Sequence, residues 1–447
     1  MVKIFQILLI FITSLLLAAC GGGGGGGGSS GEAVGGGAIP QCSENASYVD
    51  GEYNFMGNGG TYTSTNLYGL GSVCASAAYG RGATGDGQLI AVLDSGISVG
   101  EGTTTDLNQI NSNIATFLTG SDVINSDNVP QDDDNNNNTA VGSGHGSHVA
   151  GLIANEHNNS SFGGHGIAYD ATLHIIKVLD EDGSGSFAQI AAGMDLARGV
   201  SSMDIVNLSL GSSGVIGSTC DSASSCETAL GSTIYTAMEA LGSASIIQVY
   251  AAGNDGNSSP NTLAGAAIYD DDFKETTVIA VAIDSTGNLA SYSDKCGVAK
   301  AICIAAPGSS LYSFFSSNAQ SSYAVDSYAQ SMSGTSQAAP LVSGGLALIK
   351  QEFSSLTNAQ VIDRLLATAL DTGEYSKSTI YGHGLMNLNG ATAAVAKLQT
   401  INGSNLLDDP NTSYYDLAHN SFLSSAAFSN ALNNALAGQT MEVYDSF

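Results

Sequence analysis

Short apolar runs separated by glycine-rich or polar segments recur along the middle of the chain. Runs of six or seven residues, rich in Val and Ile and with little polar alternation, are typical of strands buried on both faces of a sheet. The pattern predicts six strands, at residues 88–93 (QLIAVL), 174–179 (HIIKVL), 205–210 (IVNLSL), 246–252 (IIQVYAA), 277–283 (TVIAVAI) and 301–306 (AICIAA).

Helical spacing appears between several of these runs. Ile190, Met194 and Ala197 share one face of a helix, and residues 232–241 and 336–353 also predict helices. Strands that alternate with helices predict an α/β domain of three layers, in which a mainly parallel central sheet carries helices on both faces. Functional side chains in such folds gather at the carboxyl ends of the strands.

Three reactive side chains stand at strand ends or helix starts. Asp94 directly follows a predicted strand in AVLDSGI, His145 lies in GHGSHVAG, and Ser336 precedes an apolar helix in SGTSQAAP. Asp, His and Ser are the side chains of nucleophilic acyl transfer, because a serine needs a neutral histidine to take its proton and a carboxylate to orient that histidine.

The two histidines of GHGSHVAG allow a second interpretation. His145 and His148 are three residues apart and could share a helix face around a metal ion, but zinc hydrolases space their histidines four apart with a Glu between them. We therefore expect His145 to be the base and His148 to be a packed structural residue. A non-catalytic binding module with the same fold is a further alternative, and it would require a damaged catalytic set, of which the sequence shows no sign.

The three motifs, in this order, resemble the signatures of the subtilisin-like serine proteases (subtilases, peptidase family S8), and the resemblance spans roughly residues 75–395. It implies a serine endopeptidase that works through an acyl-enzyme, with Asp94 orienting, His145 as general base and Ser336 as nucleophile. VYAAGND resembles the family's oxyanion segment, which implies that the Asn254 side chain stabilises the oxyanion. His383 in YGHGLMNL is expected to be structural.

Two further segments resemble the edges of the family's substrate cleft. They predict substrate-binding residues Gly183, Ser184 and Gly185 in one segment and Ser209, Leu210 and Gly211 in the other. The chain departs from the family at Ser147, where Thr is usual, and at Gln337, where Met or a similar residue is usual. The segment ahead of AVLDSGI is also shorter than the prosegment of many subtilases, which predicts an absent or atypical prosegment.

The N-terminus predicts an export signal. After MVK, residues 4–19 are apolar, which is shorter than the roughly 20 residues of a membrane-spanning helix. The run ends in LAAC, which resembles the lipobox of bacterial lipoproteins, so we expect residues 1–19 to be removed and Cys20 to be lipidated. A plain secretory signal with an incidental cysteine is the alternative. The expected location is the bacterial outer membrane or cell surface, with release to the medium as a further possibility.

The remaining chain divides by composition. Residues 20–46 are glycine-rich and predict a flexible tether, residues 47–398 the peptidase domain, and residues 399–447 a helical extension or a truncated linker. The extension carries helically spaced apolar positions between Leu417 and Leu436. It resembles the linker of some autotransporter-type subtilases, which predicts that the chain is a fragment or that a partner domain is absent.

Charge limits the partners. The chain has 11 Lys and Arg against 40 Asp and Glu, a net charge of −29. Nucleic acid, which is itself negatively charged, is therefore not expected as a partner. We expect a monomer that acts on protein or peptide substrates. No cofactor is expected for catalysis. The oxygen-rich segment 132–138 (DDDNNNN) predicts either a solvated loop or a structural Ca²⁺ site, with Asp132, Asp133 and Asp134 as ligands.

Six cysteines besides Cys20 favour disulfides in an exported protein. Six cysteines allow fifteen connectivities. Cys220 with Cys226 and Cys296 with Cys303 would close short loops, which leaves Cys42 to pair with Cys74.

Overall fold

The computed structural model describes residues 68–97, 113–132, 144–156, 165–314, 329–393, 396–400 and 441–445. Its centre is a six-stranded sheet in the order β2-β1-β3-β4-β5-β6. Every neighbouring pair in this sheet is parallel. The strands are β1 (Leu89–Asp94), β2 (Thr172–Lys177), β3 (Ile205–Leu208), β4 (Ile247–Ala251), β5 (Thr277–Ile283) and β6 (Cys303–Pro307).

All six strands predicted from apolar runs are confirmed. Their residues are almost all buried, because helices cover both faces of the sheet and leave no solvent-facing side to produce alternation. The predicted strand at 205–210 ends earlier, at Leu208, because Ser209 leaves the sheet to contact Ser336.

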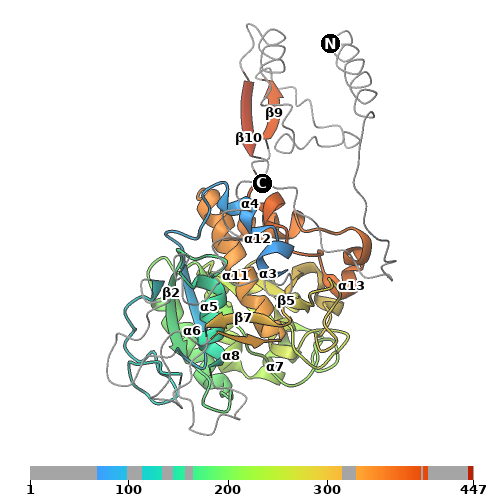
Figure 1. Cartoon of the computed structure of the whole chain (residues 1–447). Coiled ribbons are helices and arrows are strands. Elements are labelled where there is room, and N and C mark those ends of the chain that lie inside the picture. Colours follow the sequence, from blue (N-terminus) through green and yellow to red (C-terminus); the bar gives the residue numbers. More distant parts are fainter. Residues whose placement is uncertain are drawn as a thin grey trace, which may run out of the picture. The chain divides into compact units, whose positions relative to one another are not determined.

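Two glycine contacts show that helices lie on opposite faces. Gly193 of α6 (Phe187–Gly199) lies against the side chain of Leu93, and Gly146 of α5 (His145–Ala154) lies against Cβ of Asp94. Because neighbouring side chains of a strand point to opposite faces, α5 and α6 cover different sides of β1. This is the three-layer α/β arrangement that the sequence predicts (Figure 1).

Each face carries a pair of long helices. On one face α6 packs against α8 (Ser232–Ser243). On the other, α5 packs against α11 (Thr335–Glu352), which lies over β3, β4, β5 and β6. The helices predicted around Met194, at 232–241 and at 336–353 are therefore confirmed as α6, α8 and α11.

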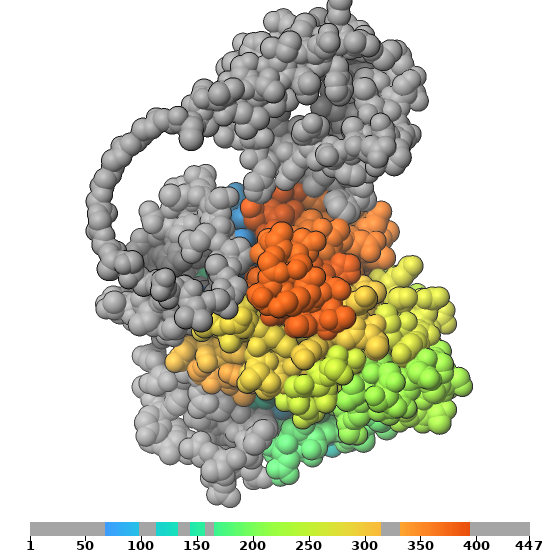
Figure 2. Space-filling model, turned by 90° about the vertical axis from the view of Figure 1, so that its right-hand side faces the viewer, coloured from blue at the N-terminus to red at the C-terminus, as the bar shows by residue number. Residues whose placement is uncertain are grey.

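The shorter helices surround this core. They are α3 (Tyr68–Ser72), α4 (Ala75–Tyr79), α7 (Ala223–Leu230), α9 (Thr262–Gly265), α10 (Asp271–Lys274), α12 (Asn358–Ala367), α13 (Ser378–Tyr381) and α14 (Leu388–Ala391). Short 3₁₀ helices are η2 (Ala266–Tyr269), η3 (Gly297–Ile302) and η4 (Gly373–Ser376). Figure 2 shows the C-terminal helices, in orange, beside the yellow segment that contains η3, in agreement with the packing of α13 on η3.

Two antiparallel strand pairs stand outside the central sheet. One joins β7 (Leu311–Phe314) to β8 (Ala329–Met332), and the other joins β9 (Ala396–Thr400) to β10 (Met441–Asp445). The sequence predicted neither pair. The helix expected between Leu417 and Leu436 lies outside the described residues.

Two predicted disulfides are confirmed, Cys220–Cys226 and Cys296–Cys303. Cys74 is also disulfide-bonded, and its expected partner Cys42 lies outside the described residues. The predicted signal, tether and Cys20 lie there too. Within the described ranges, no helix is both long and apolar enough to cross a membrane.

Candidate active site

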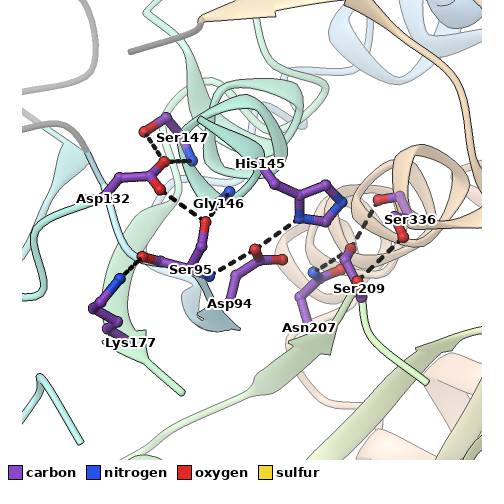
Figure 3. Close-up of polar contacts among 10 residues, drawn as sticks. All are labelled: Asp94, Ser95, Asp132, His145, Gly146, Ser147, Lys177, Asn207, Ser209 and Ser336. Carbon is purple, nitrogen blue, oxygen red and sulfur yellow. Dashed lines mark hydrogen bonds and ion pairs between the residues drawn. The ribbon is translucent and has the colours of Figure 1, made fainter. Parts of the chain in front are cut away.

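The fold brings the three motif residues together from three elements. Asp94 is the last residue of β1, His145 is the first residue of α5, and Ser336 lies in the first turn of α11. In Figure 3 the His145 ring lies between the Asp94 carboxylate and Ser336. The site therefore forms where a strand ends and two helices begin, as expected for a parallel sheet.

Asp94 and His145 form a short hydrogen bond. Nδ1 of His145 lies 2.7 Å from Oδ1 of Asp94, whose carboxylate is fully buried while the histidine side chain is 21% exposed. Ser95 N–H donates to the same oxygen over 2.7 Å. A proton on Nδ1 held by the carboxylate leaves Nε2 as the basic nitrogen, on the side of the ring that faces Ser336.

Charge near His145 favours its protonated form. Burial alone would lower the pKa of His145, but the charge and hydrogen bond of Asp94, with a smaller contribution from Asp132, outweigh burial and raise the pKa above its usual value. An imidazole with a raised pKa is a stronger base, and its imidazolium is stabilised where it forms.

Ser209 and Ser336 form two reciprocal hydrogen bonds. Ser209 Oγ donates to the Ser336 carbonyl over 2.8 Å, and Ser336 Oγ donates to the Ser209 carbonyl over 3.1 Å. The Ser336 carbonyl is available because its helical partner would be the N–H of residue 340, which is proline. The proline of SGTSQAAP thus leaves the Ser336 carbonyl free to accept the hydrogen bond that joins Ser336 to the end of β3.

A buried polar chain extends this attachment. Ser343 Oγ donates to Asn207 Oδ1 over 2.8 Å, and Asn207 Nδ2 donates to Ser209 Oγ over 3.0 Å. Asn207 and Ser343 are fully buried, so these bonds satisfy groups that would otherwise destabilise the core. The sequence analysis missed Asn207, although an amide inside the apolar run IVNLSL is a signal that could have found it.

The Asn254 side chain is oriented by Thr335. Oδ1 of Asn254 accepts from the Thr335 N–H over 2.8 Å and from its hydroxyl over 3.1 Å, and the Thr335 hydroxyl accepts from the Gly253 N–H. With its oxygen engaged, Asn254 presents Nδ2 as a donor. The Ser336 N–H is a second donor, because N–H groups in the first turn of a helix have no partner within the helix.

These two donors converge beside Gly334. A Cβ built on Gly334 would lie 2.8 Å from Gln337 Oε1, 3.4 Å from Asn254 Nδ2 and 3.5 Å from the Ser336 nitrogen. The space beside Gly334 is therefore within hydrogen-bonding reach of both donors, and the side-chain oxygen of Gln337 borders it. An oxyanion that formed on a substrate carbonyl at Ser336 would be stabilised there.

On the side of Asp94 and His145 away from Ser336 lies a second polar cluster (Figure 3). Ser95 Oγ accepts from the Gly146 N–H over 2.9 Å and donates to Asp132 Oδ1 over 2.8 Å. Asp132 Oδ2 accepts from the backbone N–H and the hydroxyl of Ser147. Lys177 Nζ donates to the Ser95 carbonyl over 2.7 Å. The cluster links the end of β1 to the start of α5, so it fixes the positions of Asp94 and His145 relative to each other.

Asp132 is the one expected calcium ligand that lies among the described residues. It is 1% exposed, and both of its oxygens accept hydrogen bonds from Ser95 and Ser147. Burial raises the pKa of Asp132, and the serine hydrogen bonds oppose that rise. Asp133 and Asp134 lie outside the described residues, so calcium binding stays a prediction.

The first predicted substrate segment forms an exposed turn. Oδ1 of Asp180 accepts from the N–H groups of Asp182 and Ser184, and Gly183 has a φ of 72°. Gly185 packs so closely that a Cβ there would lie 2.2 Å from the Val178 carbonyl oxygen. Substrate binding by Gly183, Ser184 and Gly185 remains a prediction.

Asn261 lies between the second predicted segment and the oxyanion segment. Its Nδ2 donates to the carbonyls of Ala251 and Ala252 over 3.0 and 2.9 Å, and its Oδ1 accepts from Ser212 N–H over 3.3 Å. A Cβ on Gly211 would lie 2.8 Å from Asn261 Nδ2. The sequence analysis missed this residue because nothing in its local sequence marks it.

The other singled-out residues pack into the fold. His148 is fully buried with Nε2 3.1 Å from the Leu311 carbonyl oxygen, and His383 Nε2 lies 3.0 Å from the Ala301 carbonyl oxygen. Both positions agree with the structural roles expected from the sequence. The metal-binding interpretation of His145 and His148 is not supported, because His145 binds Asp94 whereas His148 contacts the carbonyl of β7.

A buried Asp–His pair beside a serine at a helix start defines a site of the serine hydrolase class. Comparison with known proteins supports this assignment to the serine hydrolases. The family model described as "Subtilase family" matches residues 85–384. Subtilisin Savinase of Lederbergia lenta is 35% identical over 325 residues, which make up 73% of this chain and 98% of that protein. Subtilisin DY of Bacillus licheniformis is 34% identical over 326 residues, 72% of this chain and 97% of that protein.

A solved structure of proteases from Pseudoalteromonas arctica is similar with a TM-score of 0.54 and 27% identity, covering 72% of this chain and 93% of that chain. The chain belongs to the subtilase family, and it is a serine-type endopeptidase.

The space beside Gly334 gives a direct test of the oxyanion geometry. We expect Gly334→Ala to lower kcat by about 10²-fold or more, because the methyl group would stand between the two donors, and to change KM little, because the oxyanion forms only during reaction. The backbone at Gly334 has a φ of 167°, which any residue adopts, and the one contact under 3.0 Å is with Gln337 Oε1, at the end of a flexible side chain that can turn away, so the unfolding midpoint should change little. Steady-state kinetics on a peptide amide and thermal unfolding measure both.

Gly199→Ala is the matched control. It lies at the end of α6, where an added Cβ meets nothing within 4 Å, so its kcat should equal that of the parent. A Gly334→Ala enzyme with parental kcat would show that the oxyanion does not lie beside this glycine.

Proposed function

We propose that this endopeptidase cleaves peptide bonds through Asp94, His145 and Ser336, with Asn254 and the Ser336 N–H as oxyanion donors. The observation that carries the proposal is the 2.7 Å contact between His145 Nδ1 and the buried Asp94, with the opposite edge of the ring facing Ser336. The convergence of two donors beside Gly334 supports it.

The reaction follows from these positions. As substrate binds, the Ser336 hydroxyl leaves the Ser209 carbonyl and gives its proton to His145 Nε2 while Oγ attacks the scissile carbonyl. Asp94 stabilises the imidazolium, and the donors beside Gly334 stabilise the tetrahedral oxyanion. His145 then protonates the leaving amine, and a water activated by the same histidine hydrolyses the acyl-enzyme.

We also propose that the enzyme prefers a small side chain before the cleaved bond. The substrate side chain before the cleaved bond would enter the space between residues 209–212 and residues 251–254. The substrate backbone would pair with these segments as an added strand. The position of Asn261 supports this preference. Its side chain hydrogen-bonds to both segments and so occupies space that a large substrate side chain would need.

Finally, we propose export and attachment to a membrane through a lipid on Cys20. The support is the apolar run at residues 4–19 followed by LAAC and a glycine-rich stretch. A flexible stretch of that composition would let the peptidase domain reach substrates away from the lipid surface.

The nucleophile is tested by covalent labelling. A fluorophosphonate probe should label the folded protein at Ser336, and Ser336→Ala should abolish both labelling and peptide hydrolysis while leaving the unfolding midpoint close to that of the parent. Peptide mapping by mass spectrometry locates the label. Label on another residue, or no label on folded and otherwise intact protein, would overturn the mechanism.

Substrate preference is tested by replacing Asn261. We expect Asn261→Gly to raise the ratio of kcat/KM for Phe over Ala before the cleaved bond by about 10-fold or more, since misfit of even one methylene changes kcat/KM by about 10- to 200-fold. Asn288→Gly, in the turn after β5 where the amide contacts Thr286, is the control and should leave the ratio unchanged. An unchanged ratio in Asn261→Gly would exclude Asn261 from the pocket.

Lipid attachment is tested in cells. With Ser336→Ala present to prevent self-digestion, the full chain should incorporate an alkyne fatty acid and sediment with membranes, and Cys20→Ser should lose both properties. Incorporation that persists in Cys20→Ser, or none in the parent, would contradict the proposal.

A further inference from the structure

One buried carboxylate accepts hydrogen bonds from the loop that carries Asn254. Asp294 is fully buried. Its Oδ1 accepts from the backbone N–H groups of Asp255 and Asn257, over 3.2 and 2.6 Å, and its Oδ2 accepts from Asn257 Nδ2 over 3.3 Å. All three donors belong to residues that immediately follow Asn254.

The backbone around Asp294 runs alongside the same loop. Asp294 N–H donates to the Gly253 carbonyl over 2.9 Å, and the loop is bonded further at Gly256 and Asn257. Gly253 packs directly on the carboxylate, because a Cβ there would lie 2.3 Å from Asp294 Oδ2. The backbone and the side chain of Asp294 therefore contact both the residue before Asn254 and residues after it.

This carboxylate and this loop stabilise each other. Among the ion pairs of the described residues, none includes Asp294. A buried carboxylate without a cation is costly unless N–H donors surround it, and here the donors come from the loop. Burial raises the pKa of Asp294, and the hydrogen bonds from Asn257 and Asp255 oppose that rise.

We propose that Asp294 is a positioning residue of the oxyanion hole, which fixes residues 253–257 so that the Asn254 amide stays aimed at the space beside Gly334. Thr335 sets the rotation of the Asn254 amide, and Asp294 sets the path of the backbone from which that amide projects. This inference rests on the proposed function, because it acts through Asn254.

A double-mutant cycle tests the proposal. Asp294→Ala should lower kcat for a peptide amide by about 10- to 100-fold, within the roughly 10²–10³-fold that loss of one oxyanion donor causes, with little change in KM. In the Asn254→Ala background the same substitution should change kcat by less than about threefold, since the group that it positions is already gone. A purely structural role would give the same fractional loss in both backgrounds, and that result would overturn the proposal.

Two further variants separate the hydrogen-bonding role of Asp294 from the general effect of losing a carboxylate. Asp294→Asn should keep at least about a third of kcat, because its carbonyl oxygen can still accept the two backbone bonds while Asn257 turns its amide to meet the new NH₂ group. Asp284→Ala is the matched control, since Asp284 accepts the N–H groups of Thr286 and Asn288 in the turn after β5, and no hydrogen bond among the described residues joins its side chain to residues 253–257. Its kcat should stay within about twofold of the parent.

Thermal unfolding of each variant in the Ser336→Ala background reports folding separately. Should Asp294→Ala fail to fold, Asp294→Asn carries the test, and a tenfold or larger loss of kcat that is equal in the Asn254 and Asn254→Ala backgrounds would refute the proposal. A parent enzyme that takes up no fluorophosphonate at Ser336 would refute the proposed function instead, so the two failures are distinguishable.

Discussion

The hydrogen bond between Asp94 and His145 is the interaction around which the rest of the site is built. Asp94 is fully buried at the end of β1, so its charge needs donors, and it receives them from Ser95 N–H and His145 Nδ1 on a single oxygen. That geometry requires α5 to begin directly beside the strand. Gly146 makes the approach possible, because any Cβ there would lie 2.3 Å from the Gly96 carbonyl oxygen. The Ser95–Asp132–Ser147 cluster then holds strand and helix together from behind.

The other half of the site is built on the start of α11. A helix start offers unpaired N–H groups, which serve here as a potential oxyanion donor at Ser336 and as a contact for Asn254 at Thr335. Pro340 removes one helical hydrogen bond and so lets Ser209 fasten the Ser336 carbonyl to the end of β3. Each reactive group is therefore positioned by a helix start and by a neighbouring strand end, and buried polar bonds join the two. The same bonds account for the polar residues in an otherwise apolar core, such as Asn207 and Ser343.

The sequence predicted the sheet and the three reactive residues because each leaves a local signal. Buried parallel strands read as unbroken apolar runs, and the motifs around Asp94, His145 and Ser336 are contiguous. It did not predict Asn261, Asp294 or Asn207, because their roles come from contacts between segments that only the fold brings together. Asp132 was singled out for its neighbours in DDDNNNN, and the sequence did not indicate its hydrogen-bond partners Ser95 and Ser147, which lie on other elements. The sequence also did not predict the strand pairs β7–β8 and β9–β10, because in each pair the two strands are separated by an intervening segment of the chain.

An NMR pH titration of His145 in the Ser336→Ala protein, assigned by difference from His145→Gln, tests whether Asp94 controls the basicity of the imidazole. Because Asp94 raises the pKa of His145 against the effect of burial, we expect a pKa above the ordinary value of about 6.5. We also expect Asp94→Asn to lower the pKa of His145, since burial then acts without the opposing charge. A pKa at or below about 6.5 in the parent, or one that Asp94→Asn leaves unchanged, would contradict the claim that the buried carboxylate controls the base.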